Sequence, residues 1–313
     1  MAVIRVEGLQ KLYGPVRALD GLDLTVEPGT IFGFLGPNGA GKTTTIRILT
    51  GLAQATDGRA WVAGAEITTA AHQVAHRIGY LPEEPAFYPW MTPREFLDHV
   101  GRVFGLSANK RAARVKELLE LVGLAEVSKR RIGGFSRGMR QRLGLAQALV
   151  NQPEVLFLDE AVSALDPAGR KEVLELIEVL RGQCTVFMST HILADVERVC
   201  DTIGIIVRGR LVTQSPREAL LAKYAMLAFE VEADSGYETP LNSWAEALRQ
   251  MSWVQSVSIN GLKGRVIVHE IEPAKRELLP LAVQAGLVLT RYEMLHPSLE
   301  DVFLRLVGEG VEA

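Results

Sequence analysis

Residues 36–43, with the sequence GPNGAGKT, constrain the fold of this chain more than any other feature. They fit the phosphate-binding pattern G-x-x-x-x-G-K-[ST]. The apolar residues 31–35 before them predict a short buried strand, and residues 44–49 after them predict the first turns of a helix. A glycine-rich loop in this position turns its N–H groups inward, and the positive helix end adds to their attraction for phosphate. We therefore predict an α/β protein with a polyphosphate site.

Two side chains of this loop have separate predicted roles. Lys42 supplies a mobile positive charge for the β- and γ-phosphates. Thr43 offers a hydroxyl oxygen to Mg²⁺, an ion that takes few protein ligands and keeps several waters. The predicted nucleotide-binding residues are the whole loop and the residue after it: Gly36, Pro37, Asn38, Gly39, Ala40, Gly41, Lys42, Thr43 and Thr44.

The overall composition argues against several function classes. A net charge of −3 and a pI of about 6.1 do not suggest a nucleic-acid partner. No apolar run is long enough to span a bilayer and no secretory signal opens the chain, so we expect a cytoplasmic protein whose membrane role comes through a partner. Cys184 and Cys200 lack the spacing of a metal site or redox pair, and we expect them to be buried, inert thiols.

The texture of the sequence changes near residue 220, which predicts two domains, 1–220 and 221–313. In the first domain, apolar strands such as 155–158, 185–189 and 203–207 alternate with helical segments, a pattern typical of a largely parallel sheet. Between about 85 and 150 the pattern is helical throughout, with predicted helices at 95–104, 110–122 and 137–150. We interpret this stretch as a helical insert in the nucleotide-binding domain.

The second predicted domain has a different order of elements. Strand-like and helical patterns follow one another as β-α-β-β-α-β, which is the ferredoxin-like arrangement. A last predicted helix, 298–306, has Ser298 as its N-cap. The predicted elements are a strand at 226–232, a helix at 241–251, strands at 254–259 and 265–269 joined by a turn of more than two residues at Asn260-Gly261, a helix at 274–285 and a strand at 287–292.

A second chemical motif stands at the end of the apolar run 155–158, where Asp159 and Glu160 follow one another. Ligands of parallel α/β sheets bind at the carboxyl ends of the strands. Asp159 is therefore predicted to orient Mg²⁺ and its waters, and Glu160 to polarise the water that attacks the γ-phosphate. Acids often end strands in ordinary turns, so the motif gains its meaning from the phosphate-binding loop.

A third motif opens the predicted helix 137–150, with Ser136 in the N-cap position. The start of a helix suits a phosphate group, but this chain already has one phosphate site. Two copies placed head to tail would let this helix close over the nucleotide of the other copy, so that the pair sandwiches two ATP molecules. The alternative is an ordinary capped helix with solvated arginines.

Taken together, the motifs resemble those of the ATP-binding cassette (ABC) ATPases, the motor subunits of ABC transporters. Residues 1–220 contain the family's full set of motifs in the family's order. The resemblance implies ATP and Mg²⁺ as cofactors and ATP hydrolysis as the activity. It also assigns roles to the site residues. Residues 36–43 form the Walker A loop, Asp159 is the Walker B acid and Glu160 is the catalytic glutamate. Tyr13 stacks on adenine, His191 contacts the γ-phosphate, Ser136 and Gly138 belong to the signature, and residues 163–166 form the D-loop.

Two departures from the family pattern concern the charge of the site. The family's Q-loop glutamine is replaced by Glu83, which is still able to bind Mg²⁺ but adds a negative charge near the γ-phosphate. The signature, usually Ser-Gly-Gly-Gln, reads Ser136-Arg137-Gly138-Met139. We expect Ser136 and Gly138 to keep their contacts with nucleotide, while Arg137 either points away from it or makes a charge contact across the dimer seam.

These variants, with a C-terminal segment at 297–303, resemble a branch of the family that serves bacterial exporters. The resemblance implies a head-to-tail dimer, a separate transmembrane permease and a position on the inner face of the cell membrane. Trp90 and Met91, after the Q-loop, are either anchors for a permease loop or packing residues. Two alternatives are an ABC ATPase of translation or DNA repair, which usually has two cassettes or a coiled-coil insertion, and a module that holds ATP without hydrolysing it.

Overall fold

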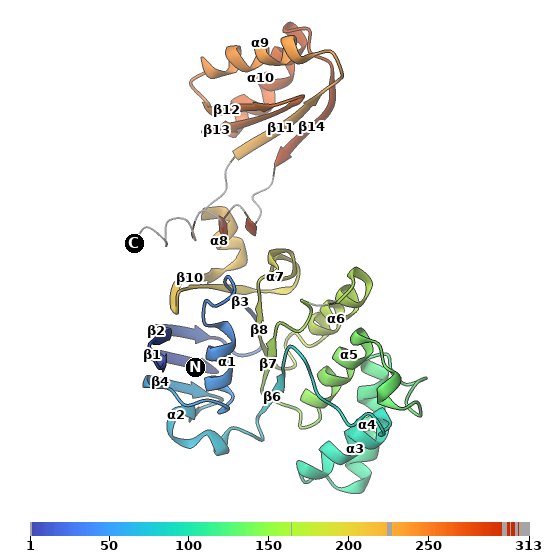
Figure 1. Cartoon of the computed structure of the whole chain (residues 1–313). Helices are drawn as coiled ribbons and strands as arrows, with labels where there is room; N and C mark the ends of the chain where they lie inside the picture. The colour runs from blue at the N-terminus through green and yellow to red at the C-terminus, as the bar shows by residue number, and fades with distance from the viewer. Residues whose placement is uncertain are drawn as a thin grey trace. The chain divides into compact units, whose positions relative to one another are not determined.

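The computed structural model describes residues 2–163, 165–223 and 227–295, and residues 299, 300, 302, 303 and 306. The chain forms two compact units that meet in sequence between Arg217 and Glu218, inside helix α8 (Arg217–Lys223). Leu306 belongs to the first unit. Figure 1 shows the elements of both units.

The first unit is built on a six-stranded sheet in the order β10-β9-β3-β8-β7-β6. All the pairings from β9 to β6 are parallel, and only β10 joins its neighbour in the antiparallel sense. Every residue of β3, β7 and β8 is buried, which is the pattern of strands covered on both faces. The strands are β3 (Ile31–Leu35), β6 (Ile78–Leu81), β7 (Val155–Asp159), β8 (Thr185–Thr190), β9 (Thr202–Val207) and β10 (Arg210–Pro216).

A second, antiparallel sheet, which the sequence analysis did not identify, packs in the same core. Its order is β2-β1-β4-β5. Buried residues alternate with exposed ones along β1 and β2, as expected for a sheet with one covered face. That face shares a hydrophobic cluster with Phe34 and Phe157 of the central sheet and with Ile46 of helix α1 (Lys42–Leu49). The strands are β1 (Ile4–Tyr13), β2 (Val16–Val26), β4 (Asp57–Val62) and β5 (Ala65–Glu66).

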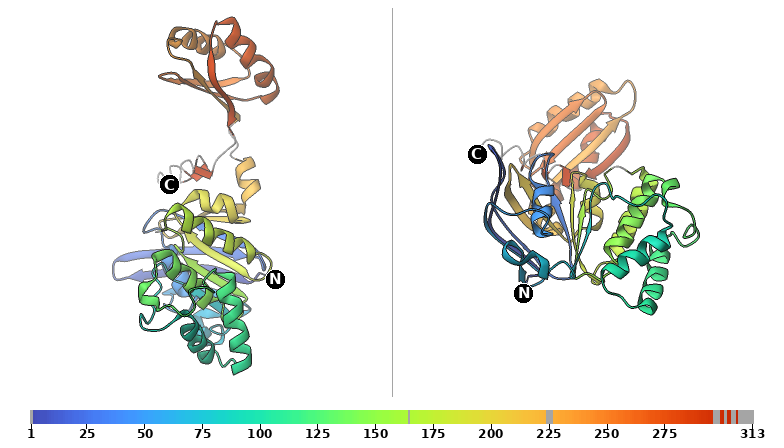
Figure 2. Two further views of the ribbon diagram at one scale, coloured as in Figure 1. Left: turned by 90° about the vertical axis from the view of Figure 1, so that its right-hand side faces the viewer. Right: turned by 60° about the horizontal axis from the view of Figure 1, so that its bottom comes forward.

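The segment between β6 and β7 is helical and contains no strand, as predicted for the insert. Its helices are α3 (Pro93–Val103), α4 (Ala108–Leu121) and α5 (Arg137–Ala148), with a short 3₁₀ turn at Ile132–Gly134. Figures 1 and 2 show them grouped beside the β6 edge of the sheet. Thr92 starts α3 with a capping box, since its Oγ1 accepts from Glu95 N (3.3 Å) and its own N–H donates to the Glu95 carboxylate (2.8 Å). The other helices of this unit are α2 (Ile67–Ala70), α6 (Pro167–Val179) and α7 (Leu193–Val199).

The second unit has the predicted ferredoxin-like fold. Its sheet has the order β12-β13-β11-β14, all antiparallel, with α9 and α10 on one face (Figure 1). Asn260 pairs with Lys263, so the hairpin turn has only two residues and is shorter than predicted. The elements are β11 (Leu227–Ala233), α9 (Glu238–Arg249), β12 (Val254–Asn260), β13 (Lys263–Val268), α10 (Ile271–Gln284) and β14 (Leu289–Leu295).

The predicted C-terminal helix is described in part. Residues 299, 300, 302, 303 and 306 are helical, and Leu299, Val302 and Leu306 are buried. The predicted N-cap Ser298 lies outside the described residues, as do Met226 at the start of the predicted strand 226–232 and Ala164 of the D-loop. None of the helices formed by the described residues combines the length and the apolar character needed to cross a membrane.

The hydrophobic core of the second unit predicts that this unit folds by itself. Trp244 is 1% exposed at the centre of that core and donates its indole N–H to the carbonyl of Leu278 (3.2 Å). A fragment of residues 218–305 should unfold cooperatively in urea, followed by far-UV circular dichroism. Trp244→Ala should lower its free energy of unfolding by about 3–5 kcal/mol, because it leaves a large cavity. A fragment without a cooperative transition would show that the second unit depends on the first.

Candidate active site

A cleft of about 500 Å³ lies where the parallel strands of the central sheet end. The loop after β3, the residue after β7 and the residue after β8 all reach it. It brings together most of the predicted site: Tyr13, Asn38, Gly39, Ala40, Gly41, Lys42, Thr43, Thr44, Glu83, Glu160 and His191. Ala18 and Ser163 also line it; Ala18 was not predicted, and Ser163 was predicted only as part of the D-loop.

The glycines of the loop are required by close backbone contacts. Gly41 has a φ of 109° and stands at the N-cap of α1, where a Cβ would come within 2.6 Å of the carbonyl oxygen of Ala18. A Cβ on Gly36 would come within 2.4 Å of the carbonyl oxygen of Ile206. Only glycine fits at both places. The loop is thereby held against the first turn of α1, the arrangement that directs N–H groups toward an anion.

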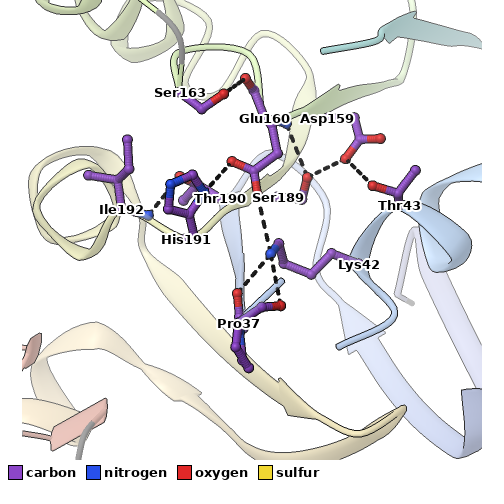
Figure 3. A network of polar contacts seen from close by, with 11 residues as sticks. Pro37, Lys42, Thr43, Asp159, Glu160, Ser163, Ser189, Thr190, His191 and Ile192 are labelled. Carbon is purple, nitrogen blue, oxygen red and sulfur yellow. Dashed lines mark hydrogen bonds and ion pairs between the residues drawn. The ribbon is translucent and has the colours of Figure 1, made fainter. Parts of the chain in front are cut away.

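Lys42 is the buried cation of the site, with only 6% of its side chain exposed. Its Nζ donates to the carbonyl oxygens of Gly36 (2.7 Å) and Pro37 (3.3 Å). It also forms an ion pair with Oε1 of Glu160 at 3.2 Å (Figure 3). A buried charge needs such partners, because leaving water without them costs several kcal/mol.

Glu160 occupies the centre of the polar network in Figure 3. Its φ of 50° lies in the left-handed region, which is uncommon for residues other than glycine and is concentrated at functional sites. Its N–H donates to Ser189, its carbonyl accepts from the Ser163 hydroxyl (2.9 Å), and its Oε2 lies 2.9 Å from Nδ1 of His191. The carboxylate is therefore held between Lys42 and His191, on the wall of the cleft.

Asp159 lies one residue before, buried at the end of β7. Its Oδ1 accepts hydrogen bonds from the hydroxyls of Ser189 (2.6 Å) and Thr43 (3.2 Å). Burial raises the pKa of the Asp159 carboxyl above its ordinary value, while these two hydrogen bonds act in the opposite direction. A carboxylate beside a hydroxyl is an oxygen donor set of the kind that Mg²⁺ uses together with substrate phosphates. The described residues contain no group of three or more His, Cys, Asp and Glu placed to hold a metal ion.

Glu83 lies between the nucleotide cleft and a second pocket of about 260 Å³. Glu84, Arg137 and Arg140 line that second pocket, and Arg137 Nη2 pairs with Glu84 Oε1 at 3.4 Å. Arg137, which departs from the family signature, therefore contacts the residue next to Glu83, which departs from the family's Q-loop, within one chain.

The start of α5 does not line the nucleotide cleft of its own chain. Ser136 caps the helix by accepting a hydrogen bond from Met139 N (3.2 Å). Among the described residues, no atom outside the neighbouring turn of α5 lies within 4 Å of where a Cβ on Gly138 would stand, so its backbone is open to approach from outside. Both residues are thus free to meet a ligand that this chain does not itself hold.

Ser189 is a site residue that was predicted only as the end of the strand 185–189, with no role in the site. Its hydroxyl donates to Asp159 and accepts from the N–H of Glu160 (3.2 Å), so it fixes both acids. Ser189 pairs with Asp159 across two parallel strands. Its role could therefore have been predicted only if the register of these strands had been known.

Comparison with known proteins agrees with this geometry. A family model described as ABC transporter matches residues 19–163. The Bacillus subtilis (strain 168) protein named Uncharacterized ABC transporter ATP-binding protein YxlF is 39% identical over 306 residues, covering 97% of this chain and 99% of that protein. The chain belongs to the family of ABC transporter ATP-binding proteins. The ATPase domains of this family hydrolyse ATP.

Two further comparisons add a named relative and a solved structure. The Daunorubicin resistance ATP-binding protein DrrA3 of Streptomyces coeruleorubidus is 35% identical over 307 residues, covering 98% of this chain and 96% of that protein. The solved structure of an ATP-binding subunit of an ABC transporter aligns with a TM-score of 0.64 and 27% identity, covering 71% of this chain and 93% of that one. The central α/β fold is thus that of an ABC cassette.

The ion pair between Lys42 and Glu160 predicts an effect on nucleotide affinity. A phosphate that binds Lys42 competes with the Glu160 carboxylate, so Glu160→Gln should bind ADP more tightly by about 3- to 10-fold, on the order of 1 kcal/mol. Glu160→Asp, which keeps the charge, is the matched control and should stay closer to the unaltered protein. Isothermal titration with ADP measures all three, and equal affinities would show that the pair does not oppose nucleotide binding.

Proposed function

We propose that this chain is the ATP-hydrolysing motor subunit of an ABC exporter. It works as a head-to-tail dimer on the inner face of the cell membrane, attached to a separate membrane-spanning permease. The observation that carries the proposal is the position of Glu160, whose carboxylate lines the same cleft as the glycine-rich loop and pairs with both Lys42 and His191. A module that only holds ATP has no need of a carboxylate at this place.

In this proposal the cleft binds ATP through three kinds of contact. The exposed ring of Tyr13 stacks on adenine, and the N–H groups of residues 38–44 with Lys42 surround the phosphates. Thr43, Asp159 and Glu83 would hold Mg²⁺, which neutralises developing charge on the phosphates when bound. Glu83 is included because it lines the same cleft as Thr43.

Hydrolysis requires that the polar network change its pairing. Lys42 moves its contact from Glu160 to the phosphates, which leaves the Glu160 carboxylate to accept a proton from the attacking water. His191, 45% exposed and already within hydrogen-bond distance of Glu160, then contacts the γ-phosphate. Two hydrogen bonds keep the Glu160 backbone in place during this change: the Ser163 hydroxyl donates to its carbonyl, and its N–H donates to the Ser189 hydroxyl.

The signature supports action in trans. Ser136 and Gly138 lie outside their own chain's cleft, with the start of α5 and an open backbone available to a second copy's nucleotide. A helix start attracts phosphate through its free N–H groups. ATP would then join two chains at their seam, and hydrolysis would let them separate.

The permease contact is proposed at the aromatic segment that follows the Q-loop. Trp90 is 65% exposed and stacks at a tilt on the half-exposed ring of Tyr88. Beside them a groove of about 450 Å³ runs along α3, lined by residues that include Phe87, Phe96 and Val100. Exposed aromatic and apolar surface of this kind marks an interaction site. Export as the direction is supported by the relative named for daunorubicin resistance, since removal of a compound from the cell gives resistance to it.

The catalytic assignment predicts the behaviour of Glu160→Gln. This variant should bind ATP but lose about 10²–10⁴-fold in turnover, the usual effect of removing a positioned base. It should also accumulate as an ATP-bound dimer, detected by size-exclusion chromatography with light scattering. Adding Ser136→Arg should block the dimer and leave ADP affinity unchanged. Near-normal turnover in Glu160→Gln would refute the role of Glu160, and a dimer that persists with Ser136→Arg would refute closure in trans.

The permease assignment predicts a loss of association in Trp90→Glu. The tagged chain, purified from native membranes in mild detergent, should carry a membrane-spanning protein that mass spectrometry identifies. Trp90→Glu should lose most of it, because a carboxylate would be buried without a partner in an apolar contact. Leu52→Glu is the matched control, since Leu52 is 64% exposed but lies outside the insert. Equal recovery with Trp90→Glu and Leu52→Glu would place the contact elsewhere.

A further inference from the structure

A buried ion pair joins α6 to α7 outside the network described above. Asp195, in the first turn of α7, is only 1% exposed. Its Oδ1 accepts from two atoms of Arg170, Nε at 2.6 Å and Nη2 at 2.5 Å. Its Oδ2 is buried and has no hydrogen-bond partner among the described residues. Arg170 is thus the principal compensation for a carboxylate that has left water.

The energetics of this pair argue against a role in stability alone. Burial raises the pKa of Asp195 above its ordinary value, and Arg170 acts in the opposite direction. Pairs of this kind seldom add stability over well-packed apolar side chains of similar volume, because the desolvation of both charges offsets their attraction. Leucine and methionine at these two positions would hold α6 and α7 together equally well. The pair adds geometric specificity, because two N–H groups of the planar guanidinium donate to Oδ1 of Asp195 and fix the angle of the contact as well as its distance.

The pair lies at the ends of two segments that reach the cleft. Arg170 is in the first turn of α6, where its N–H donates to Asp166 O (2.9 Å), and the residues just before α6 include Ser163 of the cleft wall. Asp195 stands four residues after His191. The first turns of α6 and α7 are therefore fastened to each other directly behind the two loops that hold Glu160.

The loop of His191 has few other constraints. Within the described part of the chain, the His191 ring makes one polar contact, to Glu160. The next residue, Ile192, donates its N–H to the Thr190 hydroxyl (3.0 Å) and starts α7. The place of His191 thus depends on how α7 is held.

We propose that Arg170 and Asp195 are positioning residues for ATP hydrolysis: their ion pair sets the loop of His191 relative to the loop of Ser163, so that both meet the γ-phosphate and Glu160 together. The inference rests on the proposed function, because it presumes that the cleft hydrolyses ATP. Neither residue lines the cleft, so the pair acts on the rate of hydrolysis and not on nucleotide binding.

The same two helices offer a matched control. Arg198 of α7 pairs with Glu175 and Glu178 of α6, both at 3.5 Å, but these side chains are more exposed. Exposed pairs contribute little to stability. They connect α6 and α7 farther along both helices than the Arg170–Asp195 pair. Arg198→Gln therefore removes ion pairs between the helices and keeps the Arg170–Asp195 contact, although Arg198 also lowers the pKa of Asp195 through its charge, by less than Arg170 does.

The test replaces the buried pair by apolar side chains. Arg170→Met/Asp195→Leu should fold, with thermal unfolding and ADP affinity near those of the unaltered protein, because no unpaired charge is left. Its kcat for ATP should fall by about 10- to 100-fold, since small displacements of a positioned group are costly, while KM changes by less than about twofold. Arg170→Lys, which keeps the charge but loses the two-atom contact, provides a second variant and should also lower kcat. Arg198→Gln should keep its kcat.

Three results would overturn the inference. One is a folded double variant with the kcat of the unaltered protein, which would make the pair structural only. The second is an equal loss in Arg198→Gln, which would mean that any fastening of the two helices suffices. The third is an unstable double variant together with normal kcat in Arg170→Lys. Glu160→Gln is measured in parallel, which separates the two hypotheses. If the unaltered protein hydrolyses no ATP, both the proposed function and the inference fail. If Glu160→Gln lowers the rate of hydrolysis but the variants of Arg170 and Asp195 do not, the inference alone is rejected.

Discussion

The parallel register of β3, β7 and β8 is the constraint on which the site depends. Leu35 pairs with Thr190, and Asp159 pairs with Ser189, so the strands end level with one another. The residues that follow, Gly36, Glu160 and His191, consequently emerge side by side. Gly36 and Glu160, more than 100 residues apart in sequence, thus meet at the carboxyl ends of the strands of one sheet. This is the general reason that parallel α/β sheets bind ligands at their carboxyl ends.

The second consequence of this register is electrostatic. It places two acids and a lysine in a largely buried space, where each charge requires a partner. Lys42 and Glu160 supply that partner to each other, and two hydroxyls supply it to Asp159. In the proposed function, the same groups serve phosphate, metal ion and water. Each contact of this network is therefore one that a part of the proposed nucleotide complex would replace.

The parts of this arrangement that sequence alone predicted are those encoded locally. The loop at 36–43, the acids 159 and 160 and the order of the small domain's elements each follow from a short pattern or a period. The sheet of β1, β2, β4 and β5 was missed because register shifts along β1 interrupt the alternation of buried and exposed residues. The pair of Arg170 and Asp195 had no signal at all, since two charges 25 residues apart on different helices meet only through the packing of those helices.

The four tryptophans of the chain are divided unequally between its parts. Trp244 and Trp253 are buried in the second unit, and Trp61 lies under the guanidinium of Arg5 (4.1 Å). Trp90, on the insert, is the exposed one. Indole emission shifts to longer wavelength in water, so the red edge of the protein's intrinsic fluorescence comes mainly from one position. The surface proposed to meet the permease thus carries its own optical probe, and the covering of that surface would be visible without a label.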